Sequence, residues 1–215
     1  MQDKIDKLVR PEIRALSAYH VPPANDLIKL DAMENPWSWS AGLRSAWLEA
    51  LQSVEINRYP DPSARQLHDS MRAAMAVPAS AAVILGNGSD ELIQMSIQTV
   101  AAPGRMVRAP DPTFVMYRQI ATVANMGYVA VPLQADFSLD ETAMLAALKE
   151  QQPAVTFLSY PNNPTANLFD AGTLRKILSR ADGLVVIDEA YAPFTDASFM
   201  ADIGEYDNLL VLRTV

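Results

Sequence analysis

Two adjacent carboxylates follow a short apolar run near the C-terminal end of the sequence. Residues 184–187 are Leu-Val-Val-Ile, and Asp188 and Glu189 come directly after them. Four consecutive branched apolar residues are typical of a buried central strand in a parallel sheet, and ligands bind at the carboxyl ends of such strands. Burial disfavours an ionised carboxylate unless a cation lies nearby. We therefore expect Asp188 to face either magnesium bound with a nucleotide or the protonated ring nitrogen of a cofactor such as pyridoxal phosphate.

A glycine-containing turn at residues 86–91, Gly-Asn-Gly-Ser-Asp-Glu, follows an apolar run at residues 83–85. We interpret residues 83–85 as a strand and expect a helix to begin near Asp90. The first turn of a helix has unpaired backbone N–H groups and the positive end of the helix dipole, so Ser89 and Asp90 could hold a phosphate. A simple helix cap by Ser89 or Asp90 is the alternative interpretation.

Aromatic and amide side chains follow two other expected strands. Phe114 comes after one of them, the amide pair Asn162 and Asn163 comes after another, and Tyr191 lies three residues beyond Asp188. Phe114 could instead be ordinary core, and Asn162 could simply stabilise an Asn-Pro turn. The sequence has no Gly-Lys pair, which the phosphate-binding loop of nucleotide hydrolases requires. Magnesium with a nucleotide is therefore the minor alternative.

The elements that position these residues alternate between strands and helices. Apolar runs predict strands at residues 83–85, 106–109, 128–133, 154–159, 184–187 and 209–212. Helical periodicity and capping residues predict helices at residues 42–54 and 63–76, from 90, from 114 to 126, from 140 and at 170–180. This alternation predicts an α/β fold with a doubly wound, mostly parallel sheet. Prolines in residues 1–41 indicate an N-terminal arm, which leaves residues 42–215 as the large domain.

Composition excludes several classes of function. The formal net charge of -8 makes nucleic acid and anionic membranes improbable partners. The absence of cysteine rules out disulfides and thiolate metal sites, and we expect no metal centre. The N-terminal residues contain no apolar segment typical of a secretory signal, and no apolar run could span a bilayer. We therefore expect a cytoplasmic protein.

Taken together, these motifs resemble the fold-type I, pyridoxal-phosphate-dependent aminotransferases and, within them, the histidinol-phosphate aminotransferase family. The resemblance covers nearly the whole sequence. It is carried by the segments Glu34–Pro36, Arg58–Asp61, Gly88–Glu91, Pro112–Phe114, Asn162–Thr165, Asp188–Tyr191 and Arg213–Thr214. It implies the large domain of that fold, pyridoxal phosphate as cofactor, and amino-group transfer between L-histidinol phosphate and 2-oxoglutarate in histidine biosynthesis. Related aminotransferases for aromatic amino acids or for phosphate-bearing amines are the alternatives.

The resemblance also implies a role for each cofactor-binding residue. Asp188 would pair with the pyridine nitrogen and keep it protonated, so that the ring can accept electrons when the substrate loses its α-proton. Asn163 and Tyr191 would hydrogen-bond the phenolic oxygen of the ring. We expect Asp188 and Tyr191 to be catalytic.

The other implied roles concern the cofactor phosphate, the ring face and the substrate. The backbone of Ser89 and Asp90 would hold the phosphate, and Phe114 would stack on the ring. Tyr59 would reach the phosphate of the neighbouring subunit, which implies a homodimer with shared active sites. Residues of the arm would line the substrate site, namely Tyr19, Glu34 and Asn35.

Two departures from the family pattern have structural consequences. The family usually has glycine after Asn-Asn-Pro-Thr, whereas here Ala166 and then Asn167 follow. Because asparagine tolerates left-handed backbone better than alanine, we expect that conformation to move to Asn167. In the family, the segment matching residues 213–215 leads into Ser-Lys, and that lysine binds the cofactor covalently. We therefore expect this chain to be the N-terminal portion of a longer protein. A chain without the lysine could at most be an inactive cofactor-binding or assembly module.

Overall fold

The computed structural model describes residues 2–17, 28 and 33–215. The chain divides into two compact units, one formed by Met1–His20 with Pro78–Val215 and the other by Val21–Val77. The boundary between arm and domain at residue 41 stays a prediction. Within the described ranges, no helix is long and apolar enough to cross a membrane.

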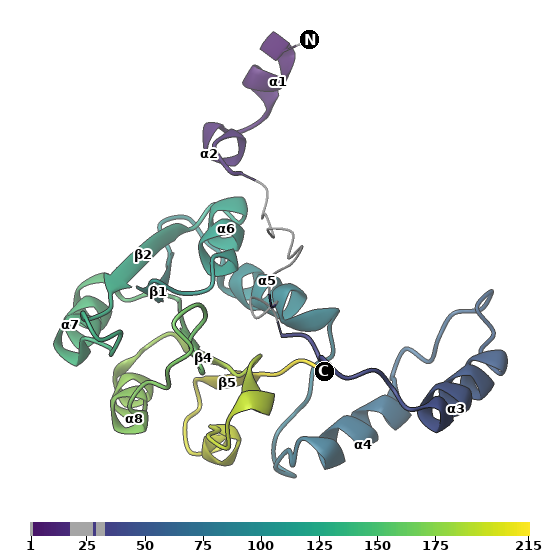
Figure 1. Ribbon diagram of the computed structural model, residues 1–215. Helices are drawn as coiled ribbons and strands as arrows, with labels where there is room; N and C mark the ends of the chain where they lie inside the picture. The colour runs from purple at the N-terminus through teal and green to yellow at the C-terminus, as the bar shows by residue number, and fades with distance from the viewer. Residues whose placement is uncertain (1, 18–27, 29–32) are drawn as a thin grey trace. The chain divides into compact units, whose positions relative to one another are not determined.

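A five-stranded sheet forms the centre of the larger unit (Figure 1). Its strand order is β2-β1-β3-β4-β5, and every neighbouring pair is parallel. The strands are β1 (Met106–Asp111), β2 (Gly127–Pro132), β3 (Val155–Ser159), β4 (Leu184–Asp188) and β5 (Leu209–Leu212). The order reverses direction at β1, because β2 lies on one side of it and β3 on the other. The predicted doubly wound α/β sheet is confirmed.

Helices cover both faces of this sheet. The helices α5 (Gly88–Val100) and α6 (Met116–Val123) pack on one face, in a cluster that includes Ile93 and Ile120. The helices α7 (Glu141–Gln151) and α8 (Ala171–Arg180) pack on the other face. Burying each large apolar side chain in these clusters contributes about 1.5–3 kcal/mol.

The buried strand β4 places its residues alternately on the two faces. Val185 and Ile187 belong to the cluster under α7 and α8, whereas Val186 belongs to the cluster under α5 and α6. Because side chains alternate along a strand, Asp188 lies on the same face as Val186. The backbone around this acid is bonded on both sides. Tyr160 N–H donates to the Asp188 carbonyl at 2.8 Å, and the next N–H, that of Glu189, donates to the Leu212 carbonyl at 2.9 Å.

Two aspartates cap helices where the sequence predicts them. The Asp140 side chain accepts from Ala143 N–H at 2.9 Å at the start of α7. The Asp170 side chain accepts from Thr173 N–H at 2.7 Å at the start of α8. Each bond satisfies one of the N–H groups that a helix start leaves unpaired, so both helices begin at these residues.

The strand predicted at residues 83–85 is wrong for the part of the chain described. These residues have no regular secondary structure and join none of the five strands. A strand is stable only when its backbone groups pair with a neighbour, and an apolar run alone does not supply one. The link between β4 and β5 is irregular apart from two short 3-10 helices, η1 (Ala192–Phe194) and η2 (Met200–Asp202).

The remaining helices lie in the N-terminal segments. In the larger unit, α1 (Gln2–Leu8) and α2 (Pro11–Arg14) are joined by Arg10, whose guanidinium donates to Asn125 Oδ1 and to the Val123 carbonyl, both at 2.7 Å. The smaller unit contains α3 (Ala41–Gln52) and α4 (Arg65–Ala74), both close to their predicted ranges.

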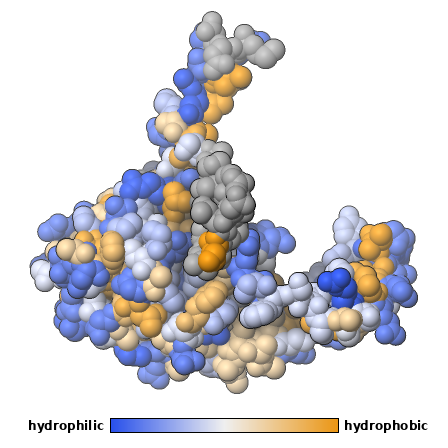
Figure 2. Space-filling view, in the orientation of Figure 1, coloured by the Kyte–Doolittle hydropathy of each residue, from blue (hydrophilic) through white to orange (hydrophobic). Residues whose placement is uncertain are grey.

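Apolar side chains of the smaller unit reach the surface, and Figure 2 shows them in orange over the α3 region. Trp37 is 80% exposed, and Trp47 on α3 is 47% exposed. The helix α4 also leaves Leu67 exposed. The apolar faces of α3 and α4 are therefore only partly covered in the described structure.

Candidate active site

Asp188 ends β4 with a carboxylate that is almost fully buried. Its relative exposure is 3%, which agrees with the prediction from the apolar run before it. One oxygen, Oδ1, accepts from Ala190 N–H at 3.1 Å, and the other, Oδ2, accepts from the Tyr117 hydroxyl at 2.6 Å. Burial raises the pKa of Asp188 above its ordinary value, and both hydrogen bonds oppose that rise. No cation pairs with this carboxylate among the described residues.

Tyr117 is a site residue that the sequence analysis missed. It lies on α6, is fully buried, and stacks on Phe157 with the ring centroids 4.6 Å apart and an interplanar angle of 14°. Its ring meets Phe114 edge to face at 5.6 Å. A signal was available, because Phe114 precedes Tyr117 by three and the helix predicted from residue 114 would place both on one face. The contact with Asp188 joins residues 71 positions apart, which the spacing does not predict.

The loops after β1 and β3 are tied together by Asn162. Its side-chain oxygen accepts from the Thr113 hydroxyl at 2.8 Å, and its amide nitrogen donates to the Pro112 carbonyl at 3.1 Å. The same nitrogen donates to Thr165 Oγ1 at 2.7 Å. All these partners lie within the protein, and Asn162 is only 2% exposed. The geometry thus favours the interpretation of Asn162 as a residue that stabilises the turn.

Asn163 and Tyr191 lie next to each other at the carboxyl edge of the sheet. The Asn163 side-chain amide donates to the Tyr191 hydroxyl at 3.4 Å, although 28 residues separate them in sequence. The backbone N–H of Asn163 donates to Ser159 Oγ at 3.3 Å, and Ser159 is the cross-strand partner of Asp188. The amide and the phenol are both only partly buried, so their polar groups can still meet a ligand.

The start of α5 also approaches Asp188. The helix begins at Gly88, two residues before its predicted start, and the negative charge of Asp90 contributes to the raised pKa of Asp188. The Glu91 carboxylate accepts from Asn87 N–H at 2.6 Å. The N–H groups of Ser89 and Asp90 find no acceptor in the described structure, and this leaves them available to an anion.

The backbone geometry of this turn requires a glycine at position 88. Gly88 has a φ of +75°, a backbone conformation that residues with side chains rarely adopt. A side chain at position 88 would therefore strain the backbone at the start of α5.

The left-handed residue of the Asn-Pro turn is Ala166, with a φ of 59°. The prediction that this conformation moves to Asn167 is therefore wrong. The Ala166 N–H donates to the Asn162 carbonyl at 2.7 Å, and the Asn167 carbonyl accepts from Asn162 N–H at 3.0 Å. The Asn167 side chain accepts from Thr165 and donates to the Phe137 carbonyl. These bonds fix the turn so that the left-handed step falls on the alanine.

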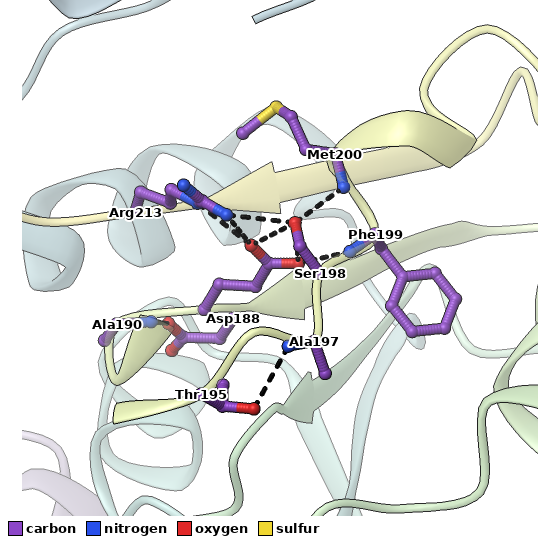
Figure 3. Close-up of polar contacts among 9 residues, drawn as sticks. Asp188, Ala190, Thr195, Ala197, Ser198, Phe199, Met200 and Arg213 are labelled. Atoms are coloured by element: carbon purple, nitrogen blue, oxygen red, sulfur yellow. Dashed lines mark hydrogen bonds and ion pairs between the residues drawn. The ribbon is translucent and has the colours of Figure 1, made fainter. Parts of the chain in front are cut away.

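Glu189, next to Asp188, forms the centre of a second buried cluster. Figure 3 labels three of its partners, Ser198, Phe199 and Arg213. The Glu189 side chain is 0% exposed and pairs with Arg213, whose Nε and Nη2 donate to Glu189 Oε2 at 2.9 and 2.8 Å. The Ser198 hydroxyl and the Phe199 N–H also donate to this carboxylate. Glu189 directly follows β4 and Arg213 directly follows the neighbouring parallel strand β5, and this topology is the signal that could have paired them. The carboxylate is thus saturated by protein groups, in contrast to Asp188.

Four predicted site residues lie outside the part of the larger unit that the structure describes. Glu34, Asn35 and Tyr59 belong to the smaller unit, where Asn35 Oδ1 accepts from Trp37 N–H at 3.0 Å and Tyr59 is fully exposed. Tyr19 lies outside the described residues. Over the described ranges, no group of three or more His, Cys, Asp or Glu side chains could hold a metal ion.

A model of the family described as aminotransferase class I and II matches residues 25–215. The chain belongs to this family. This aminotransferase chain is 55% identical over 214 residues to histidinol-phosphate aminotransferase 2 of Nitrosococcus oceani, a match covering 100% of this chain and 59% of that protein. It is 53% identical over 189 residues to a histidinol-phosphate aminotransferase sequence from Thiocapsa roseopersicina, covering 87% of this chain and 100% of that sequence. The chain thus spans about three fifths of the Nitrosococcus relative.

Solved aminotransferase structures share the fold. A putative histidinol-phosphate aminotransferase from Erwinia carotovora atroseptica superposes with a TM-score of 0.76 at 26% identity, over 92% of this chain and 58% of that one. The histidinol-phosphate aminotransferase from Sinorhizobium meliloti was solved in complex with pyridoxal-5'-phosphate. It superposes with a TM-score of 0.77 at 21% identity, over 96% of this chain and 58% of that one. The parallel sheet with its helices on both faces is therefore the large-domain fold of fold-type I aminotransferases.

Proposed function

We propose that the protein containing this chain is a pyridoxal-phosphate-dependent aminotransferase that acts on L-histidinol phosphate and 2-oxoglutarate. The observation that carries this proposal is Asp188, a buried carboxylate without a cationic partner in the described structure. A protonated pyridine nitrogen supplies the missing cation, and its charge removes the cost of ionising a buried acid. When bound, pyridoxal phosphate supplies the electron-accepting ring that amino-group transfer requires.

The residues around Asp188 fit the other polar groups of this cofactor. Asn163 and Tyr191 offer an amide and a phenol, 3.4 Å apart, to the ring's phenolic oxygen. The free N–H groups of Ser89 and Asp90 at the start of α5 would bind the phosphate. Phe114 is partly buried beside Tyr117 and would cover one face of the ring.

The substrate assignment rests on the names of the relatives. Proteins about 50% identical to this chain are named histidinol-phosphate aminotransferase, and no described residue of the site contradicts that substrate. In this proposal Glu34, Asn35 and Tyr19 line the substrate site. A cytoplasmic location stays a prediction.

A spectroscopic half-reaction tests the substrate. The full-length protein is loaded with pyridoxal phosphate, and the absorbance of the bound cofactor is followed after addition of one amine. Rapid loss with L-histidinol phosphate but not with L-phenylalanine supports the proposal. Equal rates would point to an aromatic aminotransferase, and a response to threonine phosphate alone would point to another phospho-amine. No response to any amine would indicate an inactive module.

Replacement of the central acid tests the cofactor site. Loss of one preorganised electrostatic partner in an active site lowers kcat by about a hundredfold or more, so we expect Asp188→Ala to lose at least this much. Asp182→Ala is the matched control, because Asp182 is exposed in the turn before β4. Transamination by Asp188→Ala at the control's rate would refute the assignment.

A homodimer with shared sites completes the proposal. Large apolar side chains in residues 37–59 are exposed, including Trp37, Ile56 and Tyr59, and a second copy of the protein would cover them. If Tyr59 acts on the neighbouring subunit's phosphate, then coexpressing Tyr59→Ala with Asp188→Ala should restore activity that neither variant has alone. Each mixed dimer would then contain one complete site. No recovery in a verified mixed dimer would show that Tyr59 acts within its own subunit.

A further inference from the structure

The hydroxyl of Tyr117 is held against Asp188 by the packing of its ring. Tyr117 is fully buried, stacked on Phe157 of β3 and in edge contact with Phe114. With the ring fixed on two sides, its hydroxyl can move little from the position 2.6 Å from Asp188 Oδ2. This distance is typical of a charge-assisted O–H···O bond.

The proton of this hydrogen bond belongs to the tyrosine. Burial, and next the negative charge of Asp188, raise the pKa of Tyr117 well above its ordinary value, so the phenol keeps its proton and donates it. On Asp188, burial raises the pKa, whereas the Tyr117 hydrogen bond lowers it. The bond therefore favours the ionised form of a carboxylate that its surroundings would otherwise neutralise.

The contact also leaves room for a further partner. A carboxylate has about four acceptor positions on its two oxygens. In the described structure the Asp188 side chain uses one to Tyr117 and one to Ala190 N–H. The remaining positions can accept a proton donor such as a ring nitrogen.

We propose that Tyr117 is a positioning residue for the reaction, which holds Asp188 ionised and oriented toward the ring nitrogen of the cofactor. This inference rests on the proposed function, because Asp188 must pair with that nitrogen for Tyr117 to matter. Tyr117 acts through Asp188 and needs no contact with the substrate. Its loss should therefore change kcat and leave the KM for the amino donor unchanged.

The test compares two hydroxyl deletions in the full-length holoenzyme. Tyr117→Phe keeps the buried ring and removes only the donor, whereas Tyr206→Phe removes a hydroxyl in the cluster on the opposite face of the sheet. Because a hydrogen bond to a charged group is worth about a tenfold factor or more, we expect kcat to fall at least about tenfold in Tyr117→Phe. Tyr206→Phe should stay within about twofold of wild type.

The pH dependence of cofactor binding separates positioning from a merely structural role. Without the Tyr117 donor, Asp188 takes up a proton at higher pH, so the loss of pyridoxal phosphate affinity on acidification should begin at higher pH. Replacing residue 117 alone by 3-fluorotyrosine keeps the ring and makes the phenol a stronger donor. That substitution should move the acid limb the opposite way, and it keeps the proposal testable even if Tyr117→Phe folds poorly.

Each result bears on one claim. A wild-type kcat and an unshifted acid limb in Tyr117→Phe would overturn the role of Tyr117 and leave the proposed function standing. An unshifted limb with 3-fluorotyrosine would overturn it as well. A wild-type protein that neither binds pyridoxal phosphate nor transfers an amino group would refute the proposed function itself.

Discussion

Removing the cation from the buried Glu189 cluster should destabilise the protein strongly. The perturbation is Arg213→Met, which keeps most of the aliphatic length of the side chain and deletes its charge. In the wild type, Arg213 donates twice to a carboxylate whose side chain is 0% exposed, while Arg213 itself is 21% exposed. The variant therefore leaves an anion buried without its cation.

The magnitude follows from what remains bonded. Removing one partner of a buried ion pair costs about 3–5 kcal/mol. Ser198 and the Phe199 N–H would still donate to Glu189, so we expect the lower end, about 3 kcal/mol. The control, Arg118→Met, breaks an ion pair to Asp111 whose N···O distance is 3.9 Å and whose side chains are 55% and 56% exposed. Such a surface pair is worth about 1 kcal/mol or less.

Urea unfolding of the full-length protein, followed by circular dichroism, gives both free energies of unfolding. A second comparison uses the double variant Glu189→Leu/Arg213→Met, which removes both charges. Because an apolar pair often replaces a buried ion pair at little cost, the double variant should be more stable than Arg213→Met alone. The reasoning fails if Arg213→Met and Arg118→Met are equally stable. It also fails if the double variant loses as much free energy of unfolding as the single variants Glu189→Leu and Arg213→Met lose together.

Two other predictions follow from the site. Ala166→Gly should raise the free energy of unfolding by about 1 kcal/mol, because glycine adopts the left-handed φ of 59° without the strain that alanine bears; a loss of stability in urea would contradict this. The pKa of Asp188 is raised in the folded protein without cofactor. Between the ordinary aspartate range and that raised pKa, the folded protein therefore holds a proton that the unfolded chain has released, and its stability should fall as pH rises through this window. Asp188→Asn cannot titrate and should show a flatter profile in the same urea titrations, and an unchanged slope would show that Asp188 is not its source.

Local pattern was enough to predict the sheet and its central acid. The run before Asp188 consists of four branched apolar residues, which is typical of a strand buried on both faces. The helix caps at Asp140 and Asp170 could be predicted because a capping side chain bonds the backbone N–H only three positions further along the chain. The strand expected at residues 83–85 failed because pairing depends on a neighbour that the local sequence does not specify.

The contacts that complete the site depend on tertiary structure. Tyr117 meets Asp188 across 71 positions, and Arg213 meets Glu189 across 24, so neither contact has a sequence spacing that marks it. Ala166 shows a related limit. Residue preference favoured asparagine for the left-handed position, but the hydrogen bonds of Asn162 and Asn167 overrode that preference.

The backbone on both sides of Asp188 is already bonded to its neighbouring strands, through the Tyr160 N–H and the Leu212 carbonyl. The entropy of ordering this part of the site is therefore lost when the chain folds and not when a ligand binds. Calorimetry of cofactor binding should consequently record a heat-capacity change that reflects desolvation of the ring and its pocket, without the larger contribution of a loop that folds around it. A preorganised carboxylate of this kind needs little rearrangement to meet a positive charge.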